Sequence, residues 1–206
     1  KVLAAVTAGM LCLGCAGVSG LQGVLGSVSA VLPVCAAEND TAYTVTVPVG
    51  TRTTQLTYTV NADDTVEITD CENDAAGDLE IPAEIDGKTV TSMGYYSFSY
   101  CANLTSVIIP NGVANIGDNA FGNCEKLENI TIPSSVTNIG DRSFAGCENL
   151  TSVIIPNSVE NIGYSAFDGC TSLAEITIPS SVTSIGGNAF LDTPWLAARQ
   201  EENPLV

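Results

Sequence analysis

Residues 135–157, SVTNIGDRSFAGCENLTSVIIPN, are one copy of a 23-residue unit that recurs in register across residues 90–190. The unit reads V-x-x-I-G-x-x-A/S-F-x-x-C-x-x-L-x-x-I/V-x-I-P. A fixed period of this length is the signature of a repeat protein, in which each unit packs against its neighbours and cannot fold alone. Its most regular columns are Phe98, Phe121, Phe144, Phe167 and Phe190, Cys101, Cys124, Cys147 and Cys170, and Leu104, Leu127, Leu150 and Leu173.

Each unit combines a strand, a tight corner and a turn. The segment L-x-x-I-x-I ends with apolar residues at alternating positions, which predicts a short strand, and the proline after it ends that strand. A glycine such as Gly117 or Gly140 suits a corner that needs positive φ or close backbone approach. The segment from Asp118 or Asp141 to the cysteine is interpreted as a single helical turn with the aspartate as N-cap. The predicted fold class is an α/β repeat solenoid, with parallel strands on one face, single helical turns on the other, and coils about 4.8 Å apart.

These motifs resemble the BspA-like leucine-rich repeats, the 23-residue class with the pattern L-x-x-I-x-L-P-x-x-V-x-x-I-G-x-x-A-F-x-x-C. The resemblance covers residues 79–196, over half of the chain. It implies a right-handed, curved coil with a parallel sheet on the concave side. It also implies secreted or cell-surface proteins, mostly bacterial, that take part in adhesion and macromolecule binding.

The first 37 residues differ from the rest of the chain. Residues 1–37 carry one charge, Lys1, followed by a long uncharged run rich in Ala, Val, Leu, Gly and Ser. This layout predicts a secretory signal peptide that is cleaved before Glu38. Two alternatives stay open: an uncleaved membrane anchor, because the run is long enough to span a bilayer, and a lipoprotein site at Cys15.

A β-rich N-terminal cap is predicted for residues 38–89. Residues 55–60 and 65–69 are rich in β-branched residues and flank Asn61-Ala62-Asp63-Asp64, which indicates a hairpin. Residues 79–82, LEIP, are a degenerate copy of the repeat strand and its proline. The cap is expected to cover the open edge of the first coil.

The repeat pattern ends after Phe190, and residues 191–206 predict a C-terminal cap. We expect a closing helix over Leu196, with Trp195 as its apolar cover. The chain ends on the apolar pair Leu205-Val206, which leads us to expect a longer natural protein.

Composition narrows the possible functions. The chain has 23 acidic and 6 basic residues, no histidine, and a formal net charge of −17. A strongly acidic protein is a poor partner for nucleic acid or anionic membranes. The absence of histidine removes Ser-His-Asp and Cys-His catalysis and every His-bearing metal site. No D-x-D-x-D-G calcium loop is present. We therefore expect no enzyme, no cofactor, no metal site, and no membrane span once the signal peptide is removed.

The eight cysteines fall into three groups. Cys12, Cys15 and Cys35 lie in the predicted signal peptide. The four repeat cysteines are predicted to pack in the core as small apolar side chains and to stay reduced, because their parallel Cβ vectors disfavour bridges. Cys71 lies outside the repeat and is the one candidate for a free or bridged thiol.

The candidate binding surface is the outward side of the repeat strands. Isoleucine and threonine alternate along one outward column, so isoleucines are expected in water at every second coil, either for binding or for their β propensity. We expect no deep pocket and no convergent charge, which favours an extended protein or glycan chain as ligand. Four tyrosines, Tyr95, Tyr96, Tyr100 and Tyr164, form a second candidate patch, with coil-edge packing as its alternative. The candidate strand-face residues are Ser106, Ile108, Asn129, Thr131, Ser152, Ile154, Glu175 and Thr177.

The sequence thus predicts a secreted or cell-surface, non-catalytic protein that binds an extracellular protein or glycan. Two alternatives are an accessory module of a longer extracellular enzyme and a structural spacer. The ligand itself has no signature in the sequence.

Overall fold

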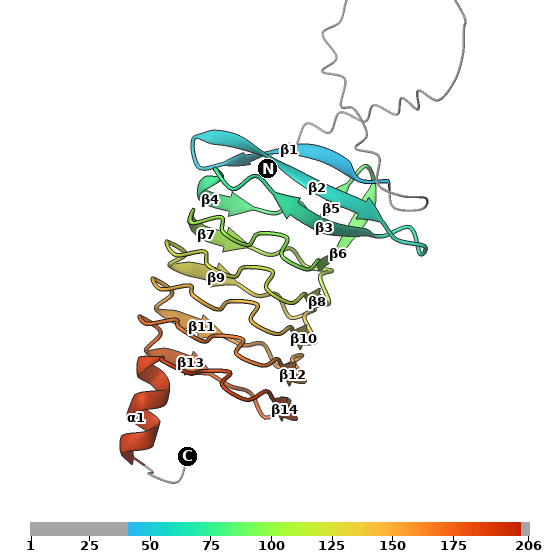
Figure 1. Ribbon diagram of the computed structural model, residues 1–206. Coiled ribbons are helices and arrows are strands. Elements are labelled where there is room, and N and C mark those ends of the chain that lie inside the picture. The colour runs from blue at the N-terminus through green and yellow to red at the C-terminus, as the bar shows by residue number, and fades with distance from the viewer. Residues whose placement is uncertain (1–40, 203–206) are drawn as a thin grey trace, which may run out of the picture.

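The computed structural model describes residues 41–202 (Figure 1). The predicted signal peptide, its cleavage site before Glu38, and Leu205-Val206 lie outside the described residues. The strands are β1 (Tyr43–Val49), β2 (Arg52–Val60), β3 (Val66–Cys71), β4 (Ala76–Glu80), β5 (Glu84–Ile85), β6 (Lys88–Met93), β7 (Asn103–Ile108), β8 (Asn115–Ile116), β9 (Asn129–Thr131), β10 (Asn138–Ile139), β11 (Ser152–Ile154), β12 (Asn161–Ile162), β13 (Glu175–Thr177) and β14 (Ser184–Ile185), and the helix is α1 (Pro194–Glu202).

The repeats stack their strands into two parallel ladders rather than the single predicted one. β4, β7 and β9 pair in order on one side of the solenoid, and β11 pairs with β13 as a separate two-stranded sheet on the same side. β6, β8, β10, β12 and β14 form a second ladder on the other side. The second ladder was not predicted, because each repeat contributes only two residues to it, such as Asn138 and Ile139.

An antiparallel meander of β1, β2 and β3 closes the N-terminal end (Figure 1). The expected hairpin is present: β2 and β3 pair antiparallel, and Val60↔Val66 is the pair next to the turn. Along β1, alternate residues face the core, which buries Val45, Val47 and Val49. β3 pairs with β6 and β1 pairs with β4, so the meander connects the two ladders. The first coil therefore has no free strand edge at this end.

The core is a set of identical columns that run along the solenoid axis. The five repeat phenylalanine rings stack with centroids 4.9–5.6 Å apart and planes within 3–12° of parallel. This spacing matches the expected distance between coils. The four repeat leucines lie beside the stack and are fully buried.

The cysteines form a second buried column. The thiol of Cys124 donates to the carbonyl of Phe98 at 3.1 Å, and Cys147 and Cys170 donate to Phe121 and Phe144 at 3.2 and 3.1 Å. Cys71 is also free and buried, and the thiol of Cys101 donates to its carbonyl at 3.9 Å. Cys71 therefore begins the cysteine column, although the sequence placed it outside the repeat.

The repeat glycines are needed for close approach of neighbouring coils. Gly163 does not have a positive φ, but a Cβ there would lie 2.5 Å from the backbone N of Asp141 and 2.5 Å from the carbonyl C of Gly140. The same crowding occurs at Gly117, Gly140 and Gly186, where the nearest backbone atom would lie at 2.7, 2.7 and 2.4 Å. Of the two explanations offered by the sequence, close approach is confirmed.

The predicted single helical turns are wrong. Residues 94–101 form successive β-turns, in which the N–H groups of Tyr96, Phe98 and Tyr100 donate to carbonyls of the next coil at 3.1, 2.7 and 2.8 Å. The chain reverses direction through left-handed residues, an arrangement that a helix cannot contain. Instead of capping a helix, the Asp118 carboxylate accepts the backbone N–H of Asp141 at 2.8 Å. The left-handed pairs are Tyr96 and Tyr100, Asn119 and Asn123, Arg142 and Gly146, Ser165 and Gly169, and Asn188 and Asp192.

Helix α1 lies at the C-terminal end, next to β13 (Figure 1). It is the one helix within residues 41–202, and none of its residues is buried. The ring of Trp195 packs against that of Phe190 with centroids 4.9 Å apart and planes tilted by 58°, and the backbone N–H of Trp195 donates to the carbonyl of Leu173 at 3.0 Å. Ile185 of the last coil stays 49% exposed, whereas Ile162 one coil earlier is 2% exposed. The predicted helix is therefore present but covers the last coil only in part.

Candidate functional site

The strand face consists of two outward columns of side chains on β4, β7, β9, β11 and β13. The first column holds Asp78, Ser106, Asn129, Ser152 and Glu175, and the second holds Glu80, Ile108, Thr131, Ile154 and Thr177. Residues at alternate strand positions point to the same side, and in-register parallel pairing stacks equivalent positions of successive coils into a column. The structure thus adds Asp78 and Glu80, on β4, to the eight residues that the repeat pattern indicated.

All eight predicted residues are on the surface. Ser106 is half-buried and the other seven are exposed. Ile108 is 44% exposed and Ile154 is 76% exposed, while their inward neighbours Val107 and Val153 are almost fully buried. The structure thus brings the eight onto one face, and their role in binding stays a prediction.

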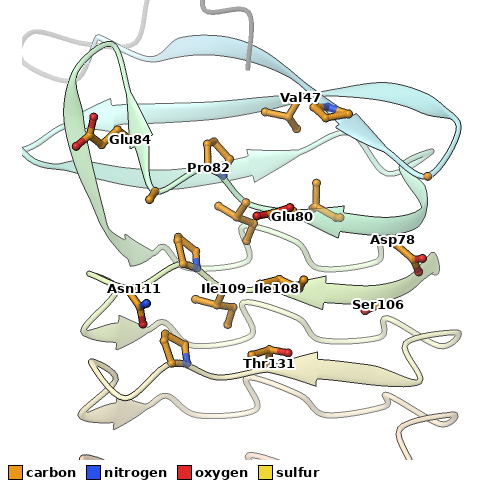
Figure 2. A pocket seen from close by; sticks show the side chains of 17 residues that line it. Val47, Asp78, Glu80, Pro82, Glu84, Ser106, Ile108, Ile109, Asn111 and Thr131 are labelled. Atoms are coloured by element: carbon orange, nitrogen blue, oxygen red, sulfur yellow. The ribbon is translucent and has the colours of Figure 1, made fainter. Parts of the chain in front are cut away.

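A groove of about 860 Å³ lies where this face meets the N-terminal meander (Figure 2). Its walls come from the end of β1, from β4 and the segment that follows it, and from β7, and they include Ser106, Ile108 and Thr131 of the predicted set. The face is therefore hollowed at this end, a feature that the sequence did not indicate. The groove escaped prediction because the non-repeating meander forms one of its walls.

Three carboxylates, from Asp78, Glu80 and Glu84, line the groove together with four prolines. Thr105 Oγ1 donates to Asp78 Oδ1 at 2.8 Å. Of the described residues that line the groove, none is Lys, Arg or aromatic. The sequence held a usable signal: if residues 79–82 copy the repeat strand, Asp78 and Glu80 must occupy its two outward positions.

The tyrosines form a distinct surface on the turns that follow the second ladder. Tyr95, Tyr96 and Tyr100 are exposed, and the first two rings meet edge to face with centroids 4.2 Å apart. A hydrogen bond with Tyr96 raises the pKa of Tyr95. Tyr164 lies three coils away and has coil-edge contacts: Arg142 lies over its ring at 5.4 Å, and Asn188 donates to its hydroxyl at 3.2 Å. Tyr164 and Tyr96 are thus about equally exposed, whereas Tyr95 and Tyr100 are the most exposed of the four.

Within residues 41–202, no group of three or more His, Cys, Asp or Glu side chains is arranged to hold a metal ion. None of the described helices has the length and apolar character required to cross a bilayer.

Taken together, stacked coils, two parallel ladders and continuous columns of Phe, Cys and Leu define a leucine-rich-repeat solenoid. The profile of the BspA type leucine rich repeat region matches residues 83–198 in six copies. The chain belongs to this family. No curated protein matches the chain.

Several solved structures share the fold. The T. pallidum leucine rich repeat protein is 32% identical with a TM-score of 0.63, over 66% of this chain and 63% of that one. A leucine rich cell surface protein from Faecalibacterium prausnitzii is 32% identical with a TM-score of 0.63, over 72% of this chain and 37% of that one. A leucine-rich repeat protein from Bacteroides ovatus is 40% identical with a TM-score of 0.59, over 66% of this chain and 37% of that one. The chain therefore spans less than two thirds of the length of these proteins.

Proposed function

We propose that this protein is a secreted or cell-surface, non-catalytic module that binds an extracellular protein or glycan through its strand face. The observation that carries the proposal is the exposure of Ile154, which is 76% exposed, together with Ile108, in the same outward column. Isoleucine in water is unfavourable unless a partner covers it, and here two of them lie on one face beside small polar residues. The cell-surface description of the F. prausnitzii protein supports the proposed location.

A second candidate function is an accessory binding module of a longer extracellular enzyme. It is favoured by the matched structures, because the chain spans only 37% of two of them. A structural spacer is the third candidate, in which the β propensity of isoleucine alone explains the exposed column.

The proposal is tested with a panel of immobilised extracellular matrix proteins and glycans. We expect Ile108→Lys combined with Ile154→Lys to weaken binding to the tightest panel member by about tenfold or more, because two bulky charges would then stand where the partner packs. The measurement is a dissociation constant from surface plasmon resonance, with melting temperatures to show that the variant is folded.

The matched control is Ile185→Lys, which changes an isoleucine that is 49% exposed on the other ladder. We expect this control to bind as the wild type does. Equal weakening by the control, or undiminished binding by the double variant, would contradict the strand face as the site. Failure of the wild type to bind any panel member would favour the spacer.

A further inference from the structure

We propose that the groove at the N-terminal end of the strand face binds an extended segment of polypeptide rich in Lys and Arg. The inference rests on the proposed function and specifies a partner for one part of that surface.

The charge of the groove is negative and locally uncompensated. Asp78, Glu80 and Glu84 line it, and no Lys or Arg does so. Within residues 41–202, the side chains of Glu80 and Glu84 have no ion pair, and the one ion pair, Lys88 with Asp64, lies outside the groove lining. A cationic partner supplies the missing opposite charge, whereas a neutral glycan or an anionic chain does not.

The spacing of the carboxylates matches that of an extended peptide. Asp78 and Glu80 are outward residues of one strand, two positions apart, which separates them by about 6.6 Å. An extended peptide presents its alternate side chains at the same interval, so Lys or Arg at positions i and i+2 can face both carboxylates. Figure 2 shows Glu84 toward one side of the groove, Glu80 near its middle and Asp78 toward the other side.

The floor suits the stems of basic side chains. Ile108 is partly exposed there, and Pro48 and Pro82 contribute rigid apolar surface. Lys and Arg lay their methylene groups along apolar surface while the charged group reaches a polar partner. Because proline rings and paired strands hold this floor, little ordering is needed when a segment binds.

The experiment uses the full chain and a short, fluorescein-labelled peptide of alternating Lys and Thr, with a peptide in which Glu replaces each Lys for comparison. The test variant is Asp78→Asn with Glu80→Gln, which keeps the shape of both side chains and removes their charge. The matched control is Glu125→Gln with Glu148→Gln, which removes two exposed charges outside the groove. Fluorescence anisotropy at low and physiological salt gives the dissociation constants.

We expect the groove variant to bind the Lys peptide about tenfold more weakly than the wild type, the control variant to differ by less than about twofold, and the Glu peptide not to bind. Equal weakening in the groove and control variants would overturn the proposal, because it would show attraction by net charge alone. Unchanged binding by the groove variant, or tighter binding of the Glu peptide, would also overturn it.

This result can be separated from a failure of the proposed function. Suppose that the wild type does not bind the Lys peptide, but that the Ile108→Lys, Ile154→Lys variant no longer binds a panel ligand. The strand face is then the binding site, and the proposal of a cationic partner is wrong. If instead the peptide binds through Asp78 and Glu80 while the isoleucine substitutions leave panel binding unchanged, the groove is a binding site and the proposal for the wider strand face is wrong.

Discussion

Replacing Gly163 by alanine is expected to lower the free energy of unfolding by about 3 kcal/mol. A Cβ at this position would lie 2.5 Å from backbone atoms of Asp141 and Gly140 in the preceding coil, and 2.6 Å from Asp141 Oδ1. Backbone atoms cannot move aside as a flexible side chain can, so the two coils must separate and their inter-coil hydrogen bonds must lengthen. Urea denaturation followed by circular dichroism measures the change.

Gly187→Ala is the matched control, because a Cβ there meets no atom closer than 3.7 Å, on the ring of Tyr164. Its backbone φ is not in the left-handed region. We expect this change to alter the free energy of unfolding by less than about 0.5 kcal/mol. Equal effects of the two substitutions would show that loss of glycine flexibility, and not crowding between coils, determines the cost.

Stability is expected to fall steeply at alkaline pH because buried thiols resist ionisation. Contact with the thiol of Cys71 and burial raise the pKa of Cys101, and burial followed by hydrogen bonding to neighbouring thiols raises the pKa of Cys147. In the unfolded chain both thiols ionise near pH 8.5. Above that pH the unfolded state binds fewer protons than the folded state, so each thiol lowers the free energy of unfolding by about 1.4 kcal/mol per pH unit.

The two thiols together are expected to cost about 2.7 kcal/mol per pH unit from about pH 8.5 upward, and to contribute no pH dependence below about pH 7.5. Urea denaturation across this range measures the slope. In the variant Cys101→Ala with Cys147→Ala the slope should become shallower by that amount, since other alkaline effects are common to both proteins. An unchanged slope would mean that these thiols ionise in the folded protein.

The repeating part of the fold was predictable because each column of core residues satisfies a single packing requirement in every coil. Phenylalanine at every twenty-third residue, as at Phe121 and Phe144, needs an apolar partner one coil away, and the stacked rings supply it. The inward and outward residues of the longer strands followed from alternation alone. The family resemblance pointed to the same architecture, and the match over residues 83–198 shows it.

The turns were mispredicted because local propensity and inter-coil bonding compete there. A segment such as Asp141 to Cys147 has the composition of a helix start, but a helix would leave the N–H groups of Arg142 and Phe144 without their acceptors on the next coil, which they reach at 2.8 Å. Asn119 and Asn123 were the sequence signal for left-handed turns, since asparagine tolerates positive φ. In the first coil the two left-handed positions are Tyr96 and Tyr100, and because tyrosine is not typical of positive φ, the sequence there gave no sign of left-handed turns.

The groove depends on contacts that no repeat encodes. Val47 and Pro48 reach it from β1, about thirty residues before the strand that they adjoin, and the pairing Val49↔Leu79 sets their position. Period and alternation describe neighbours within the solenoid, but they do not specify where a non-repeating meander joins it. The outward position of the acidic residues of β4 could be predicted from the sequence, whereas the groove wall formed by β1 could not.

The claim that the strand face is the binding surface is tested most directly by hydroxyl-radical footprinting of the protein, free and in complex with the panel member that it binds most tightly. We predict that oxidation of Ile108 and Ile154 falls on complex formation, while that of Tyr95 and Tyr100 is unchanged. Protection of Tyr95 and Tyr100 with unaltered oxidation of both isoleucines would contradict the claim and place the site on the turns.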